Sequence, residues 1–272
     1  MTPIALTIAG TDPSGGAGIQ ADLKTFSALG AYGATVVTAL VAQNTTGVQA
    51  IQDIPPAFIA RQIDSVFDDL RVDALKIGML SQVAVIETVA ERLRHWRPRW
   101  IVLDPVMVAK SGDKLLADDA IDALTRHLLP LASIITPNLP EAGVLLGEPP
   151  ARTRKEMGRV AARLQALGPN CVLLKGGHLE EEDSPDLLIH GGEHYWLEGQ
   201  RIATRHTHGT GCTLSAAITA LLARGQPLPT AVAGAKRYLA AAVAAADGLG
   251  VGHGHGPVHH FHAIWPQLEQ PR

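Results

Sequence analysis

The segment IALTIAGTDPSGGAGIQAD, residues 4–22, decides the fold. Its first six residues are mostly apolar, which predicts a buried β-strand. The glycine-rich run that follows, residues 10–18, predicts a tight turn that opens a helix. A strand that leads directly into a helix is the first half of a β-α unit, and repeated units of this kind build a parallel sheet.

The same alternation of short apolar runs and amphipathic stretches continues along the chain. Apolar residues recur at helical spacing over 58–70, after Pro55-Pro56, and again over 85–93. A β-hairpin is predicted within 186–204, around Gly191-Gly192. The predicted strands are 4–9, 34–41, 74–77, 100–104, 133–136 and 171–175.

Several of these strands are apolar without alternation, which is typical of strands covered by helices on both faces. The sequence therefore predicts an α/β protein, a three-layer α/β/α sandwich with a mostly parallel central sheet. No internal repeat or low-complexity linker interrupts the pattern, so a single domain over residues 1–272 is expected. In such sheets ligands bind at the carboxyl ends of the strands.

The composition is that of a folded globular protein, with 46% hydrophobic and 18% charged residues. The 23 basic and 26 acidic side chains give a net charge of −3, which argues against binding to nucleic acid or to an anionic membrane. No apolar run approaches a membrane span of about 20 residues, and the start of the chain lacks the basic region of a signal peptide. Two cysteines cannot make a disulfide framework. A cytoplasmic location and small-molecule partners are expected.

The glycine-rich turn has more than one interpretation. Gly16, Gly18 and Ala21 fit the dinucleotide fingerprint G-x-G-x-x-A. That fingerprint also needs an acidic residue at the end of the second strand, where Gln43-Asn44 stands here, so a nicotinamide-dependent oxidoreductase is disfavoured. A substrate pocket at exposed backbone N–H groups and a tight turn without a ligand both stay open.

The segment RHTHGTGCTLSAAITALLARG, residues 205–225, predicts an anion-binding cradle. Gly209, Thr210 and Gly211 open a long apolar helix, where uncovered N–H groups and the positive end of the helix dipole favour an anion. No Gly-Lys-Ser/Thr follows, so this is not a P-loop. Cys212 lies in the first turn, a position that lowers the pKa of a thiol. A buried structural cysteine is the alternative interpretation.

Polar residues that follow the predicted strands fit phosphate chemistry, namely Asp104, Asn138, Glu141 and Lys175. Each also has a structural interpretation, because Asn138 and Glu141 form the pattern of a helix-capping box and a lysine at a strand end often reaches solvent. Their combination favours phosphoryl transfer, which needs carboxylates for Mg²⁺, a cation for phosphate oxygens and an anion cradle.

The segment GHGHGPVHHFH, residues 252–262, carries five histidines. Their spacing matches no standard zinc pattern. The glycines and Pro257 favour a turn followed by a short helical end, and a metal site is the alternative interpretation.

Motifs along nearly the whole chain resemble those of one family. They are AGTDPSGGAGIQADLKT, DPVMVAKSGDKLL, TPNLPEA, LLKGGH, HTHGTGCTLSAAI and GHGPVHHF. Together they closely resemble the hydroxymethylpyrimidine and phosphomethylpyrimidine kinases of thiamine biosynthesis, which belong to the ribokinase-like superfamily. The resemblance implies a ribokinase-like fold, a homodimer, and ATP as co-substrate with Mg²⁺. It implies phosphorylation of 4-amino-5-hydroxymethyl-2-methylpyrimidine on its hydroxymethyl oxygen, and then of the monophosphate to the diphosphate.

The resemblance also implies a substrate pocket. Gln43 matches the side chain that recognises the aminopyrimidine, and an amide that both donates and accepts suits that ring edge. The rest of the pocket is matched by Ala17, Asp22, Met79 and Val106.

On the phosphate side, Asn138 and Glu141 match the Asn-x-x-Glu motif of the superfamily for Mg²⁺ and phosphate. Asp104 and Lys175 are expected nearby, with Asp104 and Glu141 on the metal and Lys175 on ATP, and Lys236 matches a position on the nucleotide side. Gly209 to Cys212 match the anion hole. Many ribokinase relatives carry aspartate as general base where this chain has Cys212, and the pyrimidine kinases share that departure.

Two other functions stay open. A pyridoxal or pyridoxine kinase of the same fold would also phosphorylate a hydroxymethyl group on a flat nitrogen heterocycle, although Gln43 favours the aminopyrimidine. A catalytically silent protein that binds a small ligand would leave the combination of Asp104, Glu141, Lys175 and Cys212 unexplained.

Overall fold

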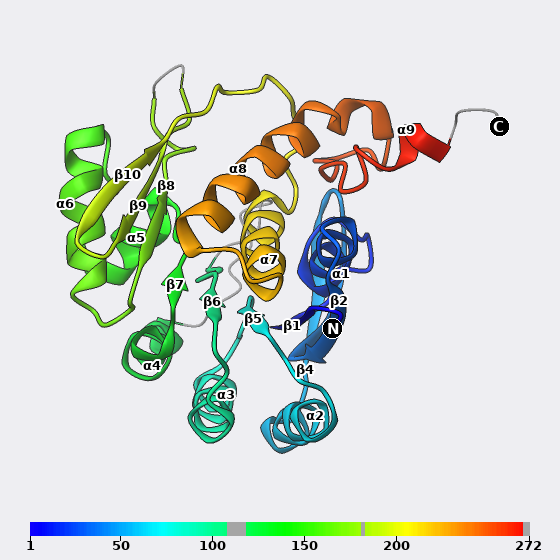
Figure 1. Ribbon diagram of the computed structural model, residues 1–272, viewed down its shortest axis with the longest axis vertical. Helices are drawn as coiled ribbons and strands as arrows, with labels where there is room; N and C mark the ends of the chain where they lie inside the picture. Colours follow the sequence, from blue (N-terminus) through cyan, green and yellow to red (C-terminus); the bar gives the residue numbers. More distant parts are fainter. Residues whose placement is uncertain (108–117, 181–182, 269–272) are drawn as a thin grey trace.

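The computed structural model describes residues 1–107, 118–180 and 183–268 (Figure 1). Residues 108–116 of the motif DPVMVAKSGDKLL lie outside the described residues. Within the described part, strands and helices alternate along most of the chain, as the β-α pattern of the sequence predicts.

The main sheet has eight strands in the order β10-β9-β8-β7-β6-β5-β1-β2. The neighbouring strands β2, β1, β5, β6, β7 and β8 run parallel. At the other edge β9 pairs antiparallel with both β8 and β10, so the expected mostly parallel sheet is confirmed. Its strands are β1 (Ile4–Ala9), β2 (Tyr32–Val37), β5 (Ala74–Ile77), β6 (Ile101–Leu103), β7 (Ile134–Ile135), β8 (Val172–Lys175), β9 (Asp186–His190) and β10 (Glu193–Leu197).

Helices cover both faces of this sheet. Figure 1 shows α2, α3 and α4 on one side and α7 and α8 on the other. The helices are α1 (Gly18–Ala28), α2 (Pro56–Asp69), α3 (Val83–Trp96), α4 (Asp118–His127), α5 (Leu139–Leu146), α6 (Arg154–Gln165), α7 (Thr210–Ala223), α8 (Leu228–Ala244) and α9 (Trp265–Leu268). None of these described helices is long and apolar enough to cross a bilayer.

Alternate residues of each strand enter different cores. In β5, Leu75 and Ile77 pack with residues of α2 to α6, whereas Ala74 packs with residues of α7 and α8. In β6, Val102 likewise faces α7 and α8. Because side chains alternate across a strand, Lys76 lies on the same face as Ala74, under α7.

The predicted strand 34–41 is wrong as a single element. The chain breaks at Thr38, whose N–H group donates to the carbonyl oxygen of Ala9 at 3.0 Å and whose hydroxyl donates to that of Met79 at 2.9 Å. These bonds tie Thr38 to the ends of β1 and β5. The chain then forms a separate antiparallel hairpin of β3 (Ala39–Asn44) and β4 (Gly47–Asp53).

The hairpin predicted around Gly191-Gly192 is confirmed as β9 and β10. Both glycines have left-handed backbones, with φ of 60° and 81°. This is the conformation that a two-residue hairpin turn requires and that glycine adopts without strain.

Candidate active site

The predicted cradle lies at the start of α7. Gly209 precedes the helix and has a left-handed backbone, with φ of 77°. A Cβ atom at Gly209 would lie 1.8 Å from the carbonyl oxygen of Gly16. Only glycine therefore lets the loop before α7 approach the glycine-rich turn so closely.

The N–H group of Thr210 donates to the carbonyl oxygen of Thr207 at 3.4 Å. The N–H groups of Gly211 and Cys212 belong to the first turn of α7. The N–H groups of a first turn have no acceptor inside the helix. These two groups, with the positive end of the helix dipole, make an anion site. It has fewer N–H donors than the predicted cradle of residues 209–212.

Asp104, Glu141 and Lys175 meet beside the cradle. Lys175 Nζ lies 3.2 Å from Asp104 Oδ1 and 3.9 Å from Glu141 Oε2. A Cβ atom at Gly211 would lie 3.4 Å from both Asp104 Oδ2 and Lys175 Nζ. The ends of β6 and β8 and the starts of α5 and α7 therefore bring one cation, two carboxylates and N–H donors together at the carboxyl edge of the sheet.

Hydrogen bonds fix the buried carboxylate of Asp104. Thr136 Oγ1 donates to Oδ1 at 3.0 Å, and Ser215 Oγ donates to Oδ2 at 3.3 Å. Burial opposes the charge on Lys175, but Asp104 and Glu141 outweigh it and raise the pKa of the ammonium above its usual value. Lys175 is therefore a permanent cation at this site.

Asn138 and Glu141 form the capping box that the sequence allows as a structural interpretation. Asn138 N–H donates to Glu141 Oε2 at 2.7 Å, and Glu141 N–H donates to Asn138 Oδ1 at 2.8 Å. Burial, together with Asp104, raises the pKa of the Glu141 carboxyl. The box places Glu141 at the cluster, so the structural and functional interpretations are compatible.

The donor set of this cluster fits Mg²⁺. Asp104 and Glu141 offer hard carboxylate oxygens, and Mg²⁺ in phosphate sites is held by one or two carboxylates together with substrate phosphates. No group of three or more histidine, cysteine, aspartate or glutamate side chains suited to a metal occurs among the described residues, which includes the histidine-rich tail up to residue 262.

The residues expected on the substrate side lie around the ends of β1, β3 and β5. Gln43 is half-buried near the end of β3, next to a bulge at Ala42. Met79 and Val106 are half-buried after β5 and β6. Ala17 caps α1. Their role as one pocket stays a prediction.

Asp22, also expected in that pocket, lies in the interior. Both carboxylate oxygens bind Lys76 Nζ, at 2.8 and 2.9 Å, and Thr7 Oγ1 donates to Oδ2 at 2.6 Å. Thr7 and Lys76 are register partners in β1 and β5, so the ion pair lies between the sheet and α1. Asp22 and Lys76 are both fully buried.

The thiol of Cys212 differs from the expectation. Burial, together with the carboxylates of Asp22 and Asp104, raises its pKa to about 11, although Lys76 and the N–H group of Gly18 act in the opposite direction. The expectation that the helix start lowers the pKa of the Cys212 thiol is therefore wrong for this structure. The cause is desolvation and two nearby carboxylates, which exceed the stabilisation that the helix start provides.

Lys236, which is expected on the nucleotide side, binds Asp186. Its ammonium donates to Asp186 Oδ2 and to the carbonyl oxygen of Ser184, both at 2.7 Å. Asp186 Oδ1 in turn accepts from the N–H group of Gly176, which follows Lys175. Asp186 thus links Lys236 to the residue next to Lys175.

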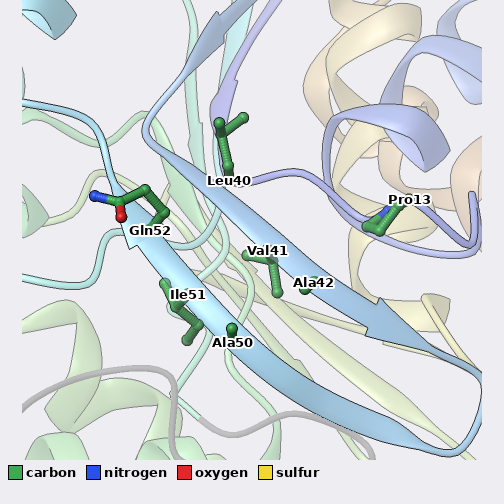
Figure 2. A pocket seen from close by; sticks show the side chains of 7 residues that line it. All are labelled: Pro13, Leu40, Val41, Ala42, Ala50, Ile51 and Gln52. Atoms are coloured by element: carbon green, nitrogen blue, oxygen red, sulfur yellow. The ribbon is translucent and has the colours of Figure 1, made fainter.

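A hollow of about 430 Å³ lies on the β3–β4 hairpin (Figure 2). Pro13 of the glycine-rich turn lines one side, and the hairpin residues Leu40, Val41, Ile51 and Gln52 line the other. This surface is apolar, since the side chains of Leu40 and Ile51 are large, hydrophobic and exposed.

Sequence reasoning missed several residues of the site. Lys76 is a lysine in an otherwise apolar strand, a signal that could have marked a buried charge. Asp12 accepts from Ser14, Gly16 and Ala17 and bonds to His208. The pattern Asp-Pro-Ser predicts such a local turn, but nothing in the sequence links it to a histidine 196 positions away.

Comparison with known proteins gives a consistent result. A family model described as phosphomethylpyrimidine kinase matches residues 12–259. The hydroxymethylpyrimidine/phosphomethylpyrimidine kinase of Salmonella typhimurium is 59% identical over 261 residues, which cover 96% of this chain and 98% of the relative.

Two solved structures are also similar. The ADP complex of Bacillus subtilis pyridoxal kinase has a TM-score of 0.90 and 40% identity, covering 97% of this chain and 99% of that one. The phosphomethylpyrimidine kinase of Clostridium difficile has a TM-score of 0.77 and 46% identity, covering 86% of this chain and 96% of that one. The ribokinase-like fold is confirmed by these likenesses.

Proposed function

Because this chain belongs to the phosphomethylpyrimidine kinase family, we propose that it transfers phosphoryl groups from ATP to 4-amino-5-hydroxymethyl-2-methylpyrimidine, and then to the resulting monophosphate, in thiamine biosynthesis. One observation carries the proposal. A Cβ atom at Gly211 would lie 3.4 Å from both Lys175 Nζ and Asp104 Oδ2, so the N–H donors of the cradle, a cation and a carboxylate border one small volume. Phosphoryl transfer depends on such positioned charge.

On the phosphate side, Lys175 and the N–H groups of Gly211 and Cys212 bind the transferring oxygens. Asp104 and Glu141 would hold Mg²⁺, which would supply positive charge to neutralise the phosphates. Asn138 orients Glu141 through the capping box. Lys236, tied to Asp186, borders the nucleotide side.

On the pyrimidine side, the amide of Gln43 pairs with the aminopyrimidine edge, and Met79 and Val106 offer apolar faces to the ring. Ala17 closes the pocket at the glycine-rich turn. Asp22 lies on α1 behind the glycine-rich turn and fixes this helix against β5 through its ion pair with Lys76. The thiolate form of Cys212 accepts the proton of the hydroxymethyl group and becomes the thiol; the raised pKa makes this thiolate a strong base but keeps its fraction small at neutral pH.

The proposal extends to the setting of the enzyme. We expect one domain, a cytoplasmic location and a homodimer. The free thiols of Cys171 and Cys212 support a reducing compartment. Exposed Leu40 and Ile51 support association through the hairpin, and sedimentation of wild type beside Leu40→Asp tests it.

Coupled ADP release tests the reaction, with the pyrimidine alcohol, its monophosphate and pyridoxal compared side by side. We expect kcat/KM to be highest for the two pyrimidines. The likeness to a pyridoxal kinase makes pyridoxal the necessary competitor. A higher kcat/KM for pyridoxal than for either pyrimidine would assign the chain to the alternative function.

A further inference from the structure

Residues 252–258, called here the tail segment, belong to the histidine-rich tail and lie outside the phosphate machinery. They nevertheless contact two parts of the candidate site, the hairpin turn at Thr45 and the loop 205–208 before the cradle, and His208 of that loop bonds in turn to Asp12 of the glycine-rich turn.

The first contact joins the tail segment to the pyrimidine side. His255 N–H donates to the carbonyl oxygen of Thr45 at 2.9 Å, and Gly254 N–H donates to Thr45 Oγ1 at 3.2 Å. Thr45 lies two residues after Gln43, in the turn between β3 and β4. A Cβ atom at Gly254 would lie 2.0 Å from the carbonyl oxygen of Thr45, so this approach requires glycine.

The second contact joins the tail segment to the cradle loop. His208 N–H donates to the carbonyl oxygen of Gly256 at 3.1 Å, and Gly256 N–H donates to His206 Nδ1 at 3.0 Å. His208 directly precedes Gly209, the residue that opens the cradle. The cradle loop is therefore held in part by backbone bonds from the tail segment.

A bond from His208 to a buried carboxylate extends this link to the glycine-rich turn. His208 Nε2 lies 2.7 Å from Asp12 Oδ2, which also accepts from the N–H group of Ala17 at 2.7 Å. Burial opposes the charge on Asp12, but hydrogen bonds to His208 and Ser14 hold the pKa of this carboxyl well below its usual range. The pair links the cradle loop to the residue that caps α1.

We propose that His208 and the tail segment are positioning residues, which hold the pyrimidine pocket and the phosphate cradle at a fixed separation. The inference rests on the proposed function, since it assigns the hairpin to the pyrimidine and the cradle to the phosphoryl group. Transfer requires the hydroxymethyl oxygen to lie about 3–3.5 Å from the phosphorus atom and in line with it, and a displacement of about 1 Å costs roughly 10² in rate.

Kinetics of His208→Ala and Gly254→Ala test the inference, with Gly248→Ala as the control because a Cβ at Gly248 meets nothing within 4 Å. We expect kcat to fall at least tenfold in both variants, with KM for ATP within threefold of wild type. His208→Gln keeps a donor near the position of Nε2 and should recover kcat to within about threefold of wild type. A purely structural role would lower the melting temperature and leave kcat of the folded protein unchanged.

Hydrogen exchange of the peptide covering residues 205–215 gives a readout that needs no substrate. We expect exchange to be at least tenfold faster in His208→Ala than in Gly248→Ala, and Thr45→Val provides a milder variant if His208→Ala does not fold. Unchanged exchange and a kcat within twofold of the control would overturn the inference. If wild type fails to phosphorylate the pyrimidine, the proposed function is wrong, and the exchange result still decides whether the tail segment holds the cradle.

Discussion

Two lysines of the same sheet, Lys76 on β5 and Lys175 on β8, are used in different ways. The Lys76 side chain is 0% exposed and binds both oxygens of a single carboxylate, Asp22. The Lys175 side chain is 15% exposed and lies between two carboxylates, Asp104 and Glu141, beside the cradle. One pair is closed, and the other cluster is open at the edge of the sheet.

The two settings show how a buried charge becomes available for function. The pair of Lys76 with Asp22 is neutral and its polar atoms are satisfied, so it stabilises the position of β5 against α1. The Lys175 cluster has one cation for two carboxylates, which leaves a deficit of positive charge that Mg²⁺ can fill and an ammonium that can still turn to a phosphate. Stability and activity should therefore separate between the two lysines.

The largest effect is expected for Lys175→Met. Removal of the cation that faces the transferring phosphate should lower kcat by about 10³ or more, because comparable cations and donors contribute about 10² to 10⁵ in rate. The loss of unfolding free energy should be smaller than for Lys76→Met, since Lys175 lies nearer water. Coupled ADP release measures kcat, with Lys155→Met, at an exposed position, as the matched control. A kcat within tenfold of Lys155→Met would remove Lys175 from the phosphate site.

Lys76→Met should instead act on stability. It leaves Asp22 as a buried, uncompensated charge, so we expect the free energy of unfolding to fall by about 3–5 kcal/mol in urea titration. Replacing both partners with apolar residues, Lys76→Met with Asp22→Leu, should recover at least half of that loss. A loss below about 1 kcal/mol in the single variant would show that the pair is not the closed element that the comparison requires.

Cys212 interacts electrostatically with both the Lys76 pair and Asp104 of the Lys175 cluster. The effect of Cys212→Ser on kcat should therefore be smaller than that of Lys175→Met. General-base catalysis is typically worth about 10² to 10⁴, and the raised pKa leaves little thiolate at neutral pH, so we expect a fall in kcat of about 10².

The pH dependence gives the sign of the Cys212 effect. The thiolate fraction grows with pH up to the pKa of about 11, so kcat of wild type should rise between about pH 7 and 9, and the rise should vanish in Cys212→Ser. A loss below threefold, with the same pH profile in both proteins, would make Cys212 a packing residue. Cys212→Asp should retain more activity than Cys212→Ser if this position accommodates the base of other ribokinase relatives.

The smallest effect is expected on the substrate side. Gln43→Leu should raise KM for the pyrimidine at least tenfold, because lost hydrogen bonds to a buried polar ligand cost about 1–3 kcal/mol. The KM for ATP and the free energy of unfolding should stay close to wild type, since Gln43 is half-buried and lies on the β3–β4 hairpin, outside the main sheet that carries the cluster. An unchanged pyrimidine KM in folded protein would remove Gln43 from the pocket.

Much of this arrangement is predictable from local sequence. The apolar strands, the glycine start of α7 and the polar residues after β6 and β8 are signals within a few residues. They are sufficient to predict a parallel sheet, a cradle and the meeting of Asp104 with Lys175. Parallel strands bring their carboxyl ends to one edge, so the grouping follows from the fold class.

The remainder depends on partners far apart in the chain. The break at Thr38 is set by hydrogen bonds to Ala9 and Met79. The composition of residues 34–41 alone therefore cannot show that β2 ends there and that β3 begins a separate hairpin. The raised pKa of Cys212 is set by burial beside Asp22 and Asp104, whose positions the helix-start rule does not include.

Phosphorus NMR of the products shows whether this site transfers phosphoryl groups to a pyrimidine alcohol. Wild type with ATP, Mg²⁺ and the pyrimidine alcohol should give a phosphomonoester resonance followed by the paired resonances of a diphosphate, while ATP is converted to ADP. Lys175→Met should give neither within the same time, and Lys155→Met should give both. Formation of inorganic phosphate alone, with no phosphorus on the pyrimidine, would contradict the account.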